Sequence, residues 1–188
     1  MLSGREYARE PLDMFGSYKI TDQIMVWGAQ CGKTGVIMGG ASYILKHEPS
    51  RFVWVMPNAD LAKTFSETRW IPMLMKTMPD LIPTGADRHD LKNMQQIIGN
   101  SILNFFGSNS PANLSSNPAR VIIQDEVDKF NAGTGSEADA VQLADLRAKN
   151  FPNPKRVKTS TPTLTDGLIW QELMKTDLRR RFLPCPGC

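Results

Sequence analysis

The feature that most constrains the fold is a glycine-containing loop between an expected strand and an expected helix. Residues Gln23–Gly28 form a short apolar run, and Lys33–Lys46 place apolar side chains close to the period of a helix. The chain between them reads Trp27-Gly28-Ala29-Gln30-Cys31-Gly32-Lys33-Thr34. Backbone N–H groups at the start of a helix that follows such a loop can surround phosphate groups. The sequence therefore predicts an α/β fold built around a phosphate-binding loop.

Individual residues of this loop suit a nucleotide and Mg²⁺. Gly32 would let the backbone approach closely, Lys33 would reach the phosphates, and the hydroxyl of Thr34 would ligate Mg²⁺. Trp27 stands where the usual pattern has its first glycine, so the loop is a variant. A bare Gly-Lys-Thr also arises by chance, and the flanking strand and helix make the interpretation specific. The expected nucleotide-binding residues are Gly28, Ala29, Gln30, Cys31, Gly32, Lys33 and Thr34.

A second motif stands at the end of another expected strand. Ala119–Gln124 is a nearly continuous apolar run of the kind buried in a parallel sheet, and Asp125, Glu126 and Asp128 follow it. A nucleotide hydrolase needs one carboxylate on Mg²⁺ and a second to activate water. Because adjacent strand residues face opposite sides, Asp125 can face the metal and Glu126 the attacking water. Asp128 is expected to be a surface charge or a helix cap.

The remaining elements alternate between strands and helices, which predicts an α/β layer fold with a mostly parallel sheet. Asn58 is an expected helix cap. Hydroxyl groups in Thr159-Ser160-Thr161 could sense the terminal phosphate, or could mark a plain strand end set by Pro162. The expected strands are Arg51–Met56, Ser101–Phe106 and Lys155–Thr161, the expected helices are Ala59–Trp70, Ser136–Lys149 and Gly167–Thr176, and the expected loops are Pro79–Asn93 and Gly107–Pro118.

Length and composition exclude several other classes of protein. The 188 residues suit one domain, and the net charge of +3 is too small to indicate nucleic-acid binding by itself. No run of about 20 apolar residues predicts a transmembrane helix, the N-terminus lacks the apolar stretch of a signal peptide, and three cysteines fit a reducing compartment. Residues 155–188 carry seven basic and three acidic side chains and could contact DNA, although most such runs are solvated faces.

Taken in order along the chain, these motifs resemble the ATPase domain of lambda-type phage large terminase subunits. The resemblance is carried by the loop from Gly28 to Thr34, Ser110-Pro111-Ala112-Asn113-Leu114, Asp125-Glu126-Val127-Asp128, Ser160-Thr161-Pro162-Thr163 and Cys185-Pro186-Gly187-Cys188. It implies a P-loop NTPase core of the additional-strand type, with a mostly parallel central sheet flanked by helices. In such a core, the strand ending at Ser160 lies between the strands ending at Gly28 and Asp125.

The resemblance also implies a function. The expected activity is ATP hydrolysis with Mg²⁺ that drives double-stranded viral DNA into a procapsid, in the cytoplasm of an infected bacterium. The expected partners are the small terminase subunit, the portal and procapsid, and further copies of the chain in a ring, with no membrane. Lys33 and Glu126 would be catalytic, Thr34 and Asp125 would hold Mg²⁺, and Ser160 and Thr161 would couple hydrolysis to movement. Residues near the N-terminus would hold the adenine, namely Tyr7, Arg9 and Glu10.

The resemblance further implies how the chain is divided. Residues 1–183 would be the ATPase domain, and residues 184–188 would begin a Cys-Pro-x-Cys segment. Full-length relatives continue into a nuclease domain that this chain lacks, so no nuclease activity is expected from it. Cys185 and Cys188 supply half of a tetrahedral zinc site, so tight zinc binding is not expected either. Many packaging motors carry an arginine before the acidic strand, but Ser108–Pro118 has none; Arg120 and Arg147 are candidates, and neither is assigned.

Two other functions remain open from the sequence. The first is a helicase-type DNA translocase, because Ala29-Gln30 and Gly32-Lys33-Thr34 also resemble helicase loops. Only one motor core fits into 188 residues, however, whereas most such helicases carry two. The second is a non-catalytic prophage fragment that binds DNA or partner proteins through its basic end.

Overall fold

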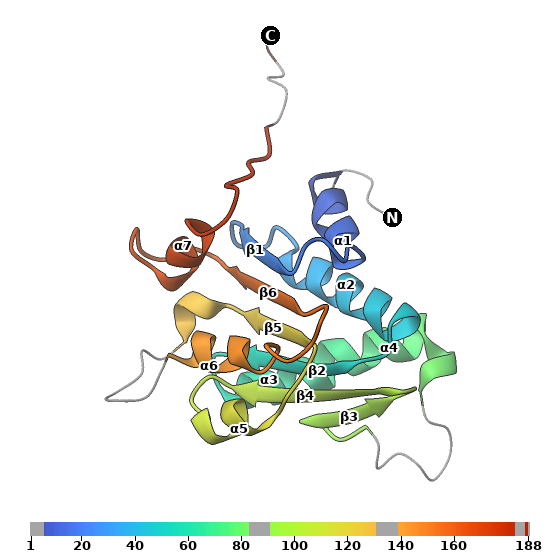
Figure 1. Ribbon diagram of the computed structural model, residues 1–188. Helices are drawn as coiled ribbons and strands as arrows, with labels where there is room; N and C mark the ends of the chain where they lie inside the picture. The colour runs from blue at the N-terminus through green and yellow to red at the C-terminus, as the bar shows by residue number, and fades with distance from the viewer. Residues whose placement is uncertain (1–5, 83–90, 131–138, 183–186, 188) are drawn as a thin grey trace.

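The computed structural model describes residues 6–82, 91–130, 139–182 and 187 (Figure 1). In these ranges one sheet has the strand order β1-β6-β5-β2-β4-β3. Strand β3 pairs antiparallel with β4, and all other neighbouring strands of the sheet are parallel. Strand β6 lies between β1 and β5, which confirms the arrangement that the resemblance implies. The strands are β1 (Asp22–Val26), β2 (Arg51–Met56), β3 (Gln95–Ile98), β4 (Ser101–Gly107), β5 (Val121–Asp125) and β6 (Lys155–Ser160).

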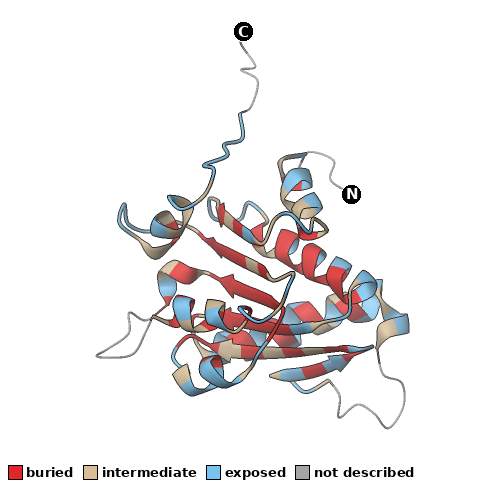
Figure 2. Cartoon of the chain, viewed as in Figure 1, coloured by how far each residue is buried: buried red, intermediate tan, exposed pale blue. Residues whose placement is uncertain are grey.

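Helices cover both faces of the sheet and bury two apolar layers (Figure 2). Alternate residues of β2 separate the layers, since Phe52 and Trp54 belong to one and Val53 and Val55 to the other. The first layer includes residues of α1 (Arg9–Phe15), α2 (Lys33–His47), α3 (Ala59–Phe65) and α4 (Ile71–Thr77). The second includes residues of α5 (Pro111–Ser116), α6 (Ala140–Leu146) and α7 (Leu168–Leu173). The α/β fold with a mostly parallel sheet is therefore confirmed.

The helix expected at Ala59–Trp70 continues further than the sequence predicts. Asn58 caps it as expected, because its side chain accepts a hydrogen bond from the amide of Leu61 at 2.9 Å. The chain then passes through a π-helical turn, η2 (Ser66–Trp70), directly into α4. Pro72 does not end the helical path, and it lies in the first turn of α4 directly after the π-helical turn.

Other elements were not expected. Strand β3 forms a hairpin with β4 through a turn at Gly99, which has a φ of +55°. Helix α5 lies inside the expected loop Gly107–Pro118, and α1 precedes the first expected strand. Ser136 and Glu137, the expected start of the helix before Lys149, lie outside the described residues. Shorter helical turns are η1 (Glu6–Ala8), η3 (Pro79–Leu81) and η5 (Val127–Lys129). No helix of the described ranges is long and apolar enough to cross a membrane.

Helix α1 packs closely on α2 because Gly40 has no side chain. A Cβ atom at Gly40 would lie 2.2 Å from Cγ of Phe15, whose ring is almost completely buried. Gly35 belongs to the same helix, but a Cβ atom there would meet nothing within 4 Å. The two glycines therefore lie in the same helix but differ in the space beside their Cα atoms.

We expect Gly40→Ala to lower the free energy of unfolding by about 1–3 kcal/mol, because the added methyl group overpacks against an aromatic ring. The matched control Gly35→Ala should raise the free energy of unfolding by roughly 0.5–1 kcal/mol, because alanine favours a helix more than glycine does. Urea denaturation of both variants measures the difference. Equal effects of the two substitutions would show that the contact between α1 and α2 is not this close.

Candidate functional site

The candidate site lies where β1, β6 and β5 end at the same edge of the sheet, beside the start of α2. The loop after β1 reaches α2 through Gly32, whose φ of +87° is in the left-handed region. Residues with a side chain rarely adopt this conformation, so the loop requires glycine at this position. The first turn of α2 presents backbone N–H groups without partners inside the helix, which is the arrangement that binds phosphate.

The ammonium group of Lys33 connects three parts of this edge. The side chain is 6% exposed, and its Nζ donates to the carbonyl oxygen of Gly28 at 3.3 Å and to Oγ1 of Thr161 at 2.5 Å. The same Nζ lies 3.6 Å from Oε1 of Glu126. One buried cation therefore contacts the loop, the end of β6 and the acidic turn after β5.

Thr34 and Asp125 present oxygen atoms beside that cation. The hydroxyl of Thr34 donates to Oδ2 of Asp125 at 3.4 Å, and Asp125 is 1% exposed. Burial, followed by the negative charge of Glu126, raises the pKa of Asp125 to about 6, while the Lys33 ammonium opposes the shift. The other carboxylate oxygen of Asp125, Oδ1, is buried and has no hydrogen-bond partner within the described ranges.

These oxygens fit a magnesium ion. Mg²⁺ prefers oxygen ligands and keeps several waters, so one or two protein oxygens are enough beside a nucleotide. The unpartnered Oδ1 of Asp125 is an acceptor that such a shell would satisfy. Across the described part of the chain there is no group of three or more His, Cys, Asp or Glu side chains that could hold a metal by itself. A cation here would therefore depend on Thr34, Asp125 and the ligand's own phosphates.

Glu126 sits on a strained backbone turn. Its φ of +61° is left-handed, which costs roughly 1–2 kcal/mol for a residue with a side chain. The turn begins η5, and it leaves the carboxylate partly exposed between Lys33 and Lys129, whose Nζ lies 3.3 Å from Oε2. Such outliers occur where the surrounding structure requires a particular side-chain direction. Asp125 and Glu126 are thus aimed differently even though they are adjacent.

Residues at the end of β6 join the same group. Thr161 accepts a hydrogen bond from Lys33, and Ser160 Oγ accepts one from the amide of Asp128 at 3.3 Å. The structure therefore brings Lys33, Thr34, Asp125, Glu126 and Thr161 together, although they come from three separate parts of the chain. Asp128 caps α7, because its Oδ1 accepts from the amide of Ile169 at 2.7 Å.

The N-terminal residues expected near adenine divide into two groups. The hydroxyl of Tyr7 donates to the carbonyl oxygen of Cys31 at 2.9 Å, and its ring packs edge-on against Trp27 with centroids 5.4 Å apart. Glu10 instead pairs with Arg179 at 2.8 Å, and with Arg9 these two line an open groove beside α1. Tyr7 therefore lies on the loop. The contact of Trp27 with Tyr7 was not expected, and the sequence marks Trp27 only as a departure from the usual pattern.

Both arginine candidates make contacts within the chain. Arg120 is buried before the start of β5, at the edge opposite Asp125, where its Nη2 lies 3.0 Å from Oε2 of Glu48. Arg147 donates to the carbonyl oxygens of Leu143 and Ser115. Because both guanidinium groups are engaged within the chain, neither is assigned a role toward a neighbouring copy.

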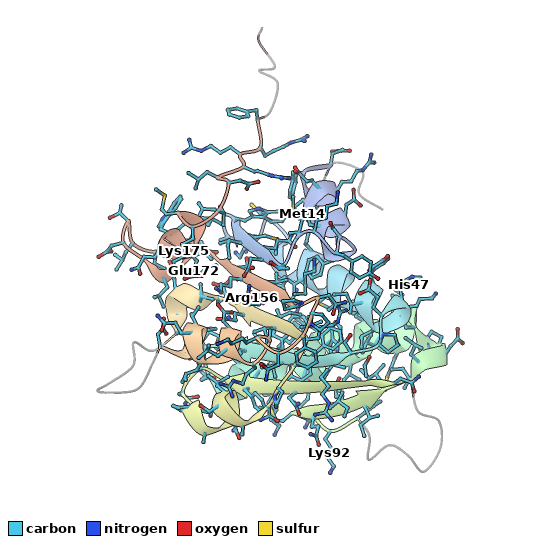
Figure 3. All side chains as sticks on the ribbon, in the orientation of Figure 1. Met14, His47, Lys92, Arg156, Glu172 and Lys175 are labelled. Carbon is cyan, nitrogen blue, oxygen red and sulfur yellow. The ribbon has the colours of Figure 1, made fainter. Side chains whose placement is uncertain are left out.

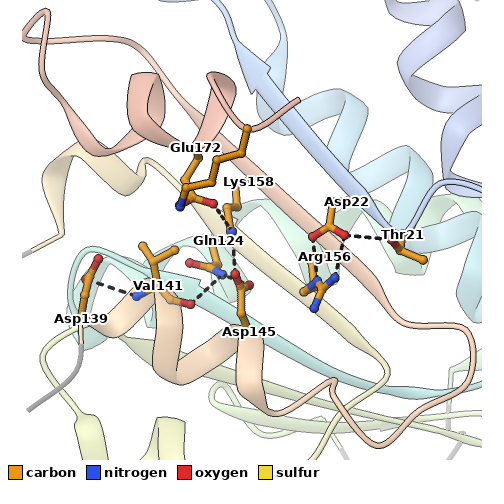
Figure 4. A network of polar contacts seen from close by, with 10 residues as sticks. Thr21, Asp22, Gln124, Asp139, Val141, Asp145, Arg156, Lys158 and Glu172 are labelled. Carbon is orange, nitrogen blue, oxygen red and sulfur yellow. Dashed lines mark hydrogen bonds and ion pairs between the residues drawn. The ribbon is translucent and has the colours of Figure 1, made fainter. Parts of the chain in front are cut away.

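Part of the basic end segment does not form a free surface, because its three basic residues on β6 make contacts inside the fold. Lys155 donates to carbonyl oxygens after and within α1, and Arg156 pairs with Asp22 at 2.6 Å. Lys158 pairs with Asp145 at 2.6 Å and with Glu172 (Figure 4). Burial opposes the charge of Lys158, but these two contacts outweigh it and raise the pKa of the ammonium group. Lys175 follows the end of α7 and lies beside Glu172 (Figure 3).

Comparison with protein families gives one match. The family described as the ATPase domain of the phage terminase large subunit gpA matches residues 5–188 of the chain. No curated protein matches at a significant level.

Solved structures share the fold at low sequence identity. The large terminase of the thermophilic bacteriophage D6E has a TM-score of 0.66 at 14% identity, covering 89% of this chain and 41% of that one. The large terminase ATPase domain of Thermus phage P74-26 has a TM-score of 0.55 at 18% identity, covering 81% of this chain and 64% of that one. The packaging motor assembly of bacteriophage Phi-29 has a TM-score of 0.60 at 15% identity, covering 94% of this chain and 54% of that one. The chain thus spans about two fifths of the D6E protein.

The raised pKa of Asp125 predicts that the ionised carboxylate lowers the free energy of unfolding of the protein. With a pKa of about 6 in the folded protein and about 3.9 in the unfolded chain, the folded state holds the proton longer, so this group lowers stability as pH rises from 4 through 6. We expect Asp125→Asn to raise the free energy of unfolding by up to about 3 kcal/mol near pH 7.5, and by much less near pH 4. Urea denaturation without Mg²⁺ or nucleotide measures both values. A variant that is less stable than the parent near pH 7.5 would contradict the burial argument.

Proposed function

The chain belongs to the ATPase-domain family of the phage terminase large subunit gpA, and we propose that its site binds ATP with Mg²⁺ and hydrolyses it to drive DNA packaging. One observation carries the proposal: the buried Lys33 contacts both Thr161 and Glu126 at the edge where Thr34 meets Asp125. A cation, a hydroxyl and two carboxylates at one helix start are the groups that phosphoryl transfer uses. Residues 1–183 would form this ATPase domain, and residues 184–188 would begin the next segment.

Binding of the nucleotide would begin with the loop. The amide groups from Gly28 to Thr34 and the ammonium of Lys33 would hold the β- and γ-phosphates. Tyr7 lies against this loop, which supports a place for the adenine on that side. Thr34 Oγ1 and Asp125 would hold Mg²⁺, which when bound neutralises charge that develops on the phosphate oxygens.

Glu126 is the proposed general base. Its carboxylate would take a proton from the attacking water as the new bond to the γ-phosphorus forms and the bond to the bridging oxygen breaks. Two ammonium groups lie close to this carboxylate, that of Lys33 at 3.6 Å and that of Lys129 at 3.3 Å, and they hold it beside the start of α2. The left-handed turn at Glu126 supports the assignment, because it separates the direction of this carboxylate from that of Asp125.

Coupling would start at Lys33. An ammonium group has three protons to donate. Here Lys33 donates to the carbonyl oxygen of Gly28 and to Oγ1 of Thr161, and it also forms an ion pair with Glu126. Phosphate oxygens would compete for the same protons, so the contact with Thr161 would depend on the nucleotide. Ser160 and Thr161 are therefore proposed to transmit hydrolysis to movement.

The wider assembly follows from the family. We propose the partners that the family resemblance implies, namely double-stranded viral DNA, the small terminase subunit, the portal and procapsid, and a ring of copies, in the cytoplasm of the bacterial host. The likeness to the Phi-29 viral genome packaging motor assembly supports a place in such a motor. A helicase-type translocase is the second candidate, because the ATPase core would serve it equally well. Strand displacement on a forked duplex distinguishes the two, since a packaging motor moves duplex DNA without separating its strands.

Binding and chemistry should separate by substitution. We expect Lys33→Ala to impair ATP binding itself, because the ammonium contacts the ground-state phosphates. Glu126→Gln should bind ATP with near-normal affinity but lower turnover by about 10²–10⁴-fold, because loss of a general base raises the barrier by roughly 3–5 kcal/mol. The matched control Asp128→Asn, which neutralises the acid at the start of α7, should stay within a few-fold of the parent. ATP affinity and turnover are measured for all three under conditions where the parent hydrolyses ATP.

If Asp128→Asn abolishes turnover while Glu126→Gln does not, the assignment of the general base is wrong, even though the family assignment stands. If Lys33→Ala binds ATP as tightly as the parent, the loop is not the phosphate site.

DNA binding should depend on the arginines beyond α7 rather than on β6. Arg180 and Arg181 are exposed, whereas Lys155 and Lys158 are buried. If each arginine neutralises one phosphate, the double substitution Arg180→Gln/Arg181→Gln should change the salt dependence of duplex binding. The slope of the logarithm of the DNA association constant against the logarithm of the salt concentration should become shallower by about 2. The control Lys63→Gln/Lys76→Gln removes equal charge from exposed positions of α3 and α4 and should leave the slope unchanged. Duplex binding across a salt series measures both slopes. Equal slopes for the parent and the arginine variant would exclude this surface.

A further inference from the structure

Asp128 makes more contacts than a helix cap requires. Its Oδ1 accepts from the amide of Ile169 in α7 at 2.7 Å, and its Oδ2 accepts from the amide of Thr163 at 3.1 Å. The hydroxyl of Thr163 also points to Oδ2, at 3.4 Å. One carboxylate therefore holds both ends of the connection between β6 and α7.

The connection is shaped to let this carboxylate approach. A Cβ atom at Gly167 would lie 2.7 Å from Oδ2 of Asp128, so a side chain at Gly167 would displace the carboxylate. The backbone amide of Asp128 donates to Ser160 Oγ at 3.3 Å, which fixes the end of β6 to the same residue. Asp128 thus touches the last residue of β6, the start of the connection and the start of α7.

The first residue of this connection is also the one that Lys33 contacts. Thr161 Oγ1 accepts from Lys33 Nζ at 2.5 Å, and Ser160 Oγ donates to the carbonyl oxygen of Thr161 at 3.2 Å. Hydrogen bonds therefore link consecutive residues from Lys33 through Thr161 and Ser160 to Asp128, and from Asp128 to α7, although at Thr161 and Asp128 the link passes between side chain and backbone. Glu172 of α7 then pairs with Lys158 of β6, so α7 is held at both ends.

We propose that Asp128 is a positioning residue that carries the state of the Lys33–Thr161 contact to α7. The proposal rests on the proposed function, because it takes nucleotide phosphates to be what redirects Lys33. When Lys33 turns to phosphate, Thr161 loses its donor and the end of β6 is free to adjust. Asp128 binds the residues on either side of the connection, so this adjustment reaches α7 instead of being absorbed by the intervening residues.

Amide hydrogen exchange of the 188-residue chain tests the relay, with Mg²⁺ and the non-hydrolysable analogue AMP-PNP as the probe. The measured quantity is the ratio of exchange rates with and without AMP-PNP in peptides covering residues 161–174. In the parent we expect this ratio to differ from one by roughly fivefold or more. Asp128→Asn should bring the ratio close to one while leaving AMP-PNP affinity within about threefold of the parent.

Two further variants separate a relay from a cap. Loss of a cap alone speeds exchange at the start of α7 by about 2–30-fold both with and without AMP-PNP, and so leaves the ratio unchanged. Thr161→Val removes the contact with Lys33 but keeps the cap. It should bring the ratio of exchange rates close to one without speeding exchange in α7. The matched control Asp166→Asn, an exposed acid in the same connection, should behave as the parent.

Each outcome decides a different point. A parent that binds AMP-PNP with no change over residues 161–174 overturns the relay and leaves the proposed function intact. An Asp128→Asn variant that keeps the parent's ratio also overturns it, whatever its absolute exchange rates. A parent that does not bind AMP-PNP overturns the proposed function, and the relay with it.

Discussion

The buried ammonium of Lys33 is the charge around which the rest of the site is arranged. Removing a cation from water is costly unless other groups replace the lost hydration, so the carboxyl edge of the sheet must supply acceptors. Those acceptors come from the loop after β1, the end of β6 and the turn after β5. A strand inserted between β1 and β5 is what makes this possible, because it brings a hydroxyl to within reach of both motifs.

The same physical rule explains why charge along the sequence is a poor guide to this surface. Lys155 and Lys158 lie three residues apart on an interior strand, so their side chains face opposite sides of the sheet. One binds backbone carbonyls near α1, and the other binds carboxylates of α6 and α7. Lys155 therefore links α1 to the sheet, and Lys158 links α6 and α7 to it. Counting basic residues cannot distinguish such a lysine from a solvated one, because the distinction depends on its partners in the fold. The partner of Lys155 is more than a hundred residues away in the sequence, and those of Lys158 lie on helices that cover the sheet.

Sequence reasoning succeeded where one local pattern determines the structure. The loop at Gly32, the cap at Asn58 and the buried strand before Asp125 each depend on neighbouring residues, and each was found. It failed where distant packing decides, as in the π-helical turn at Ser66–Trp70, where buried Trp70 hydrogen-bonds Gln96 of the unexpected β3. The residues alone suggested that hydroxyls of Thr159-Ser160-Thr161 could sense the terminal phosphate. The strand order that puts Thr161 beside Lys33 came only through the family resemblance, because no local pattern indicates which strands are adjacent.

The seating of α1 has a consequence for moving this site into another protein. Just before α1, Tyr7 contacts the loop that follows β1. At the end of α1, Phe15 fills the space left by Gly40, and Lys155 binds the carbonyl oxygen of Met14. The side of the loop that faces Tyr7 is therefore a composite surface, set by a helix that is fixed to the body at its far end. A designer who grafts the loop with α2 alone would transfer the loop without the helix that packs beside it. The smallest portable unit also includes α1 and the first residue of β6.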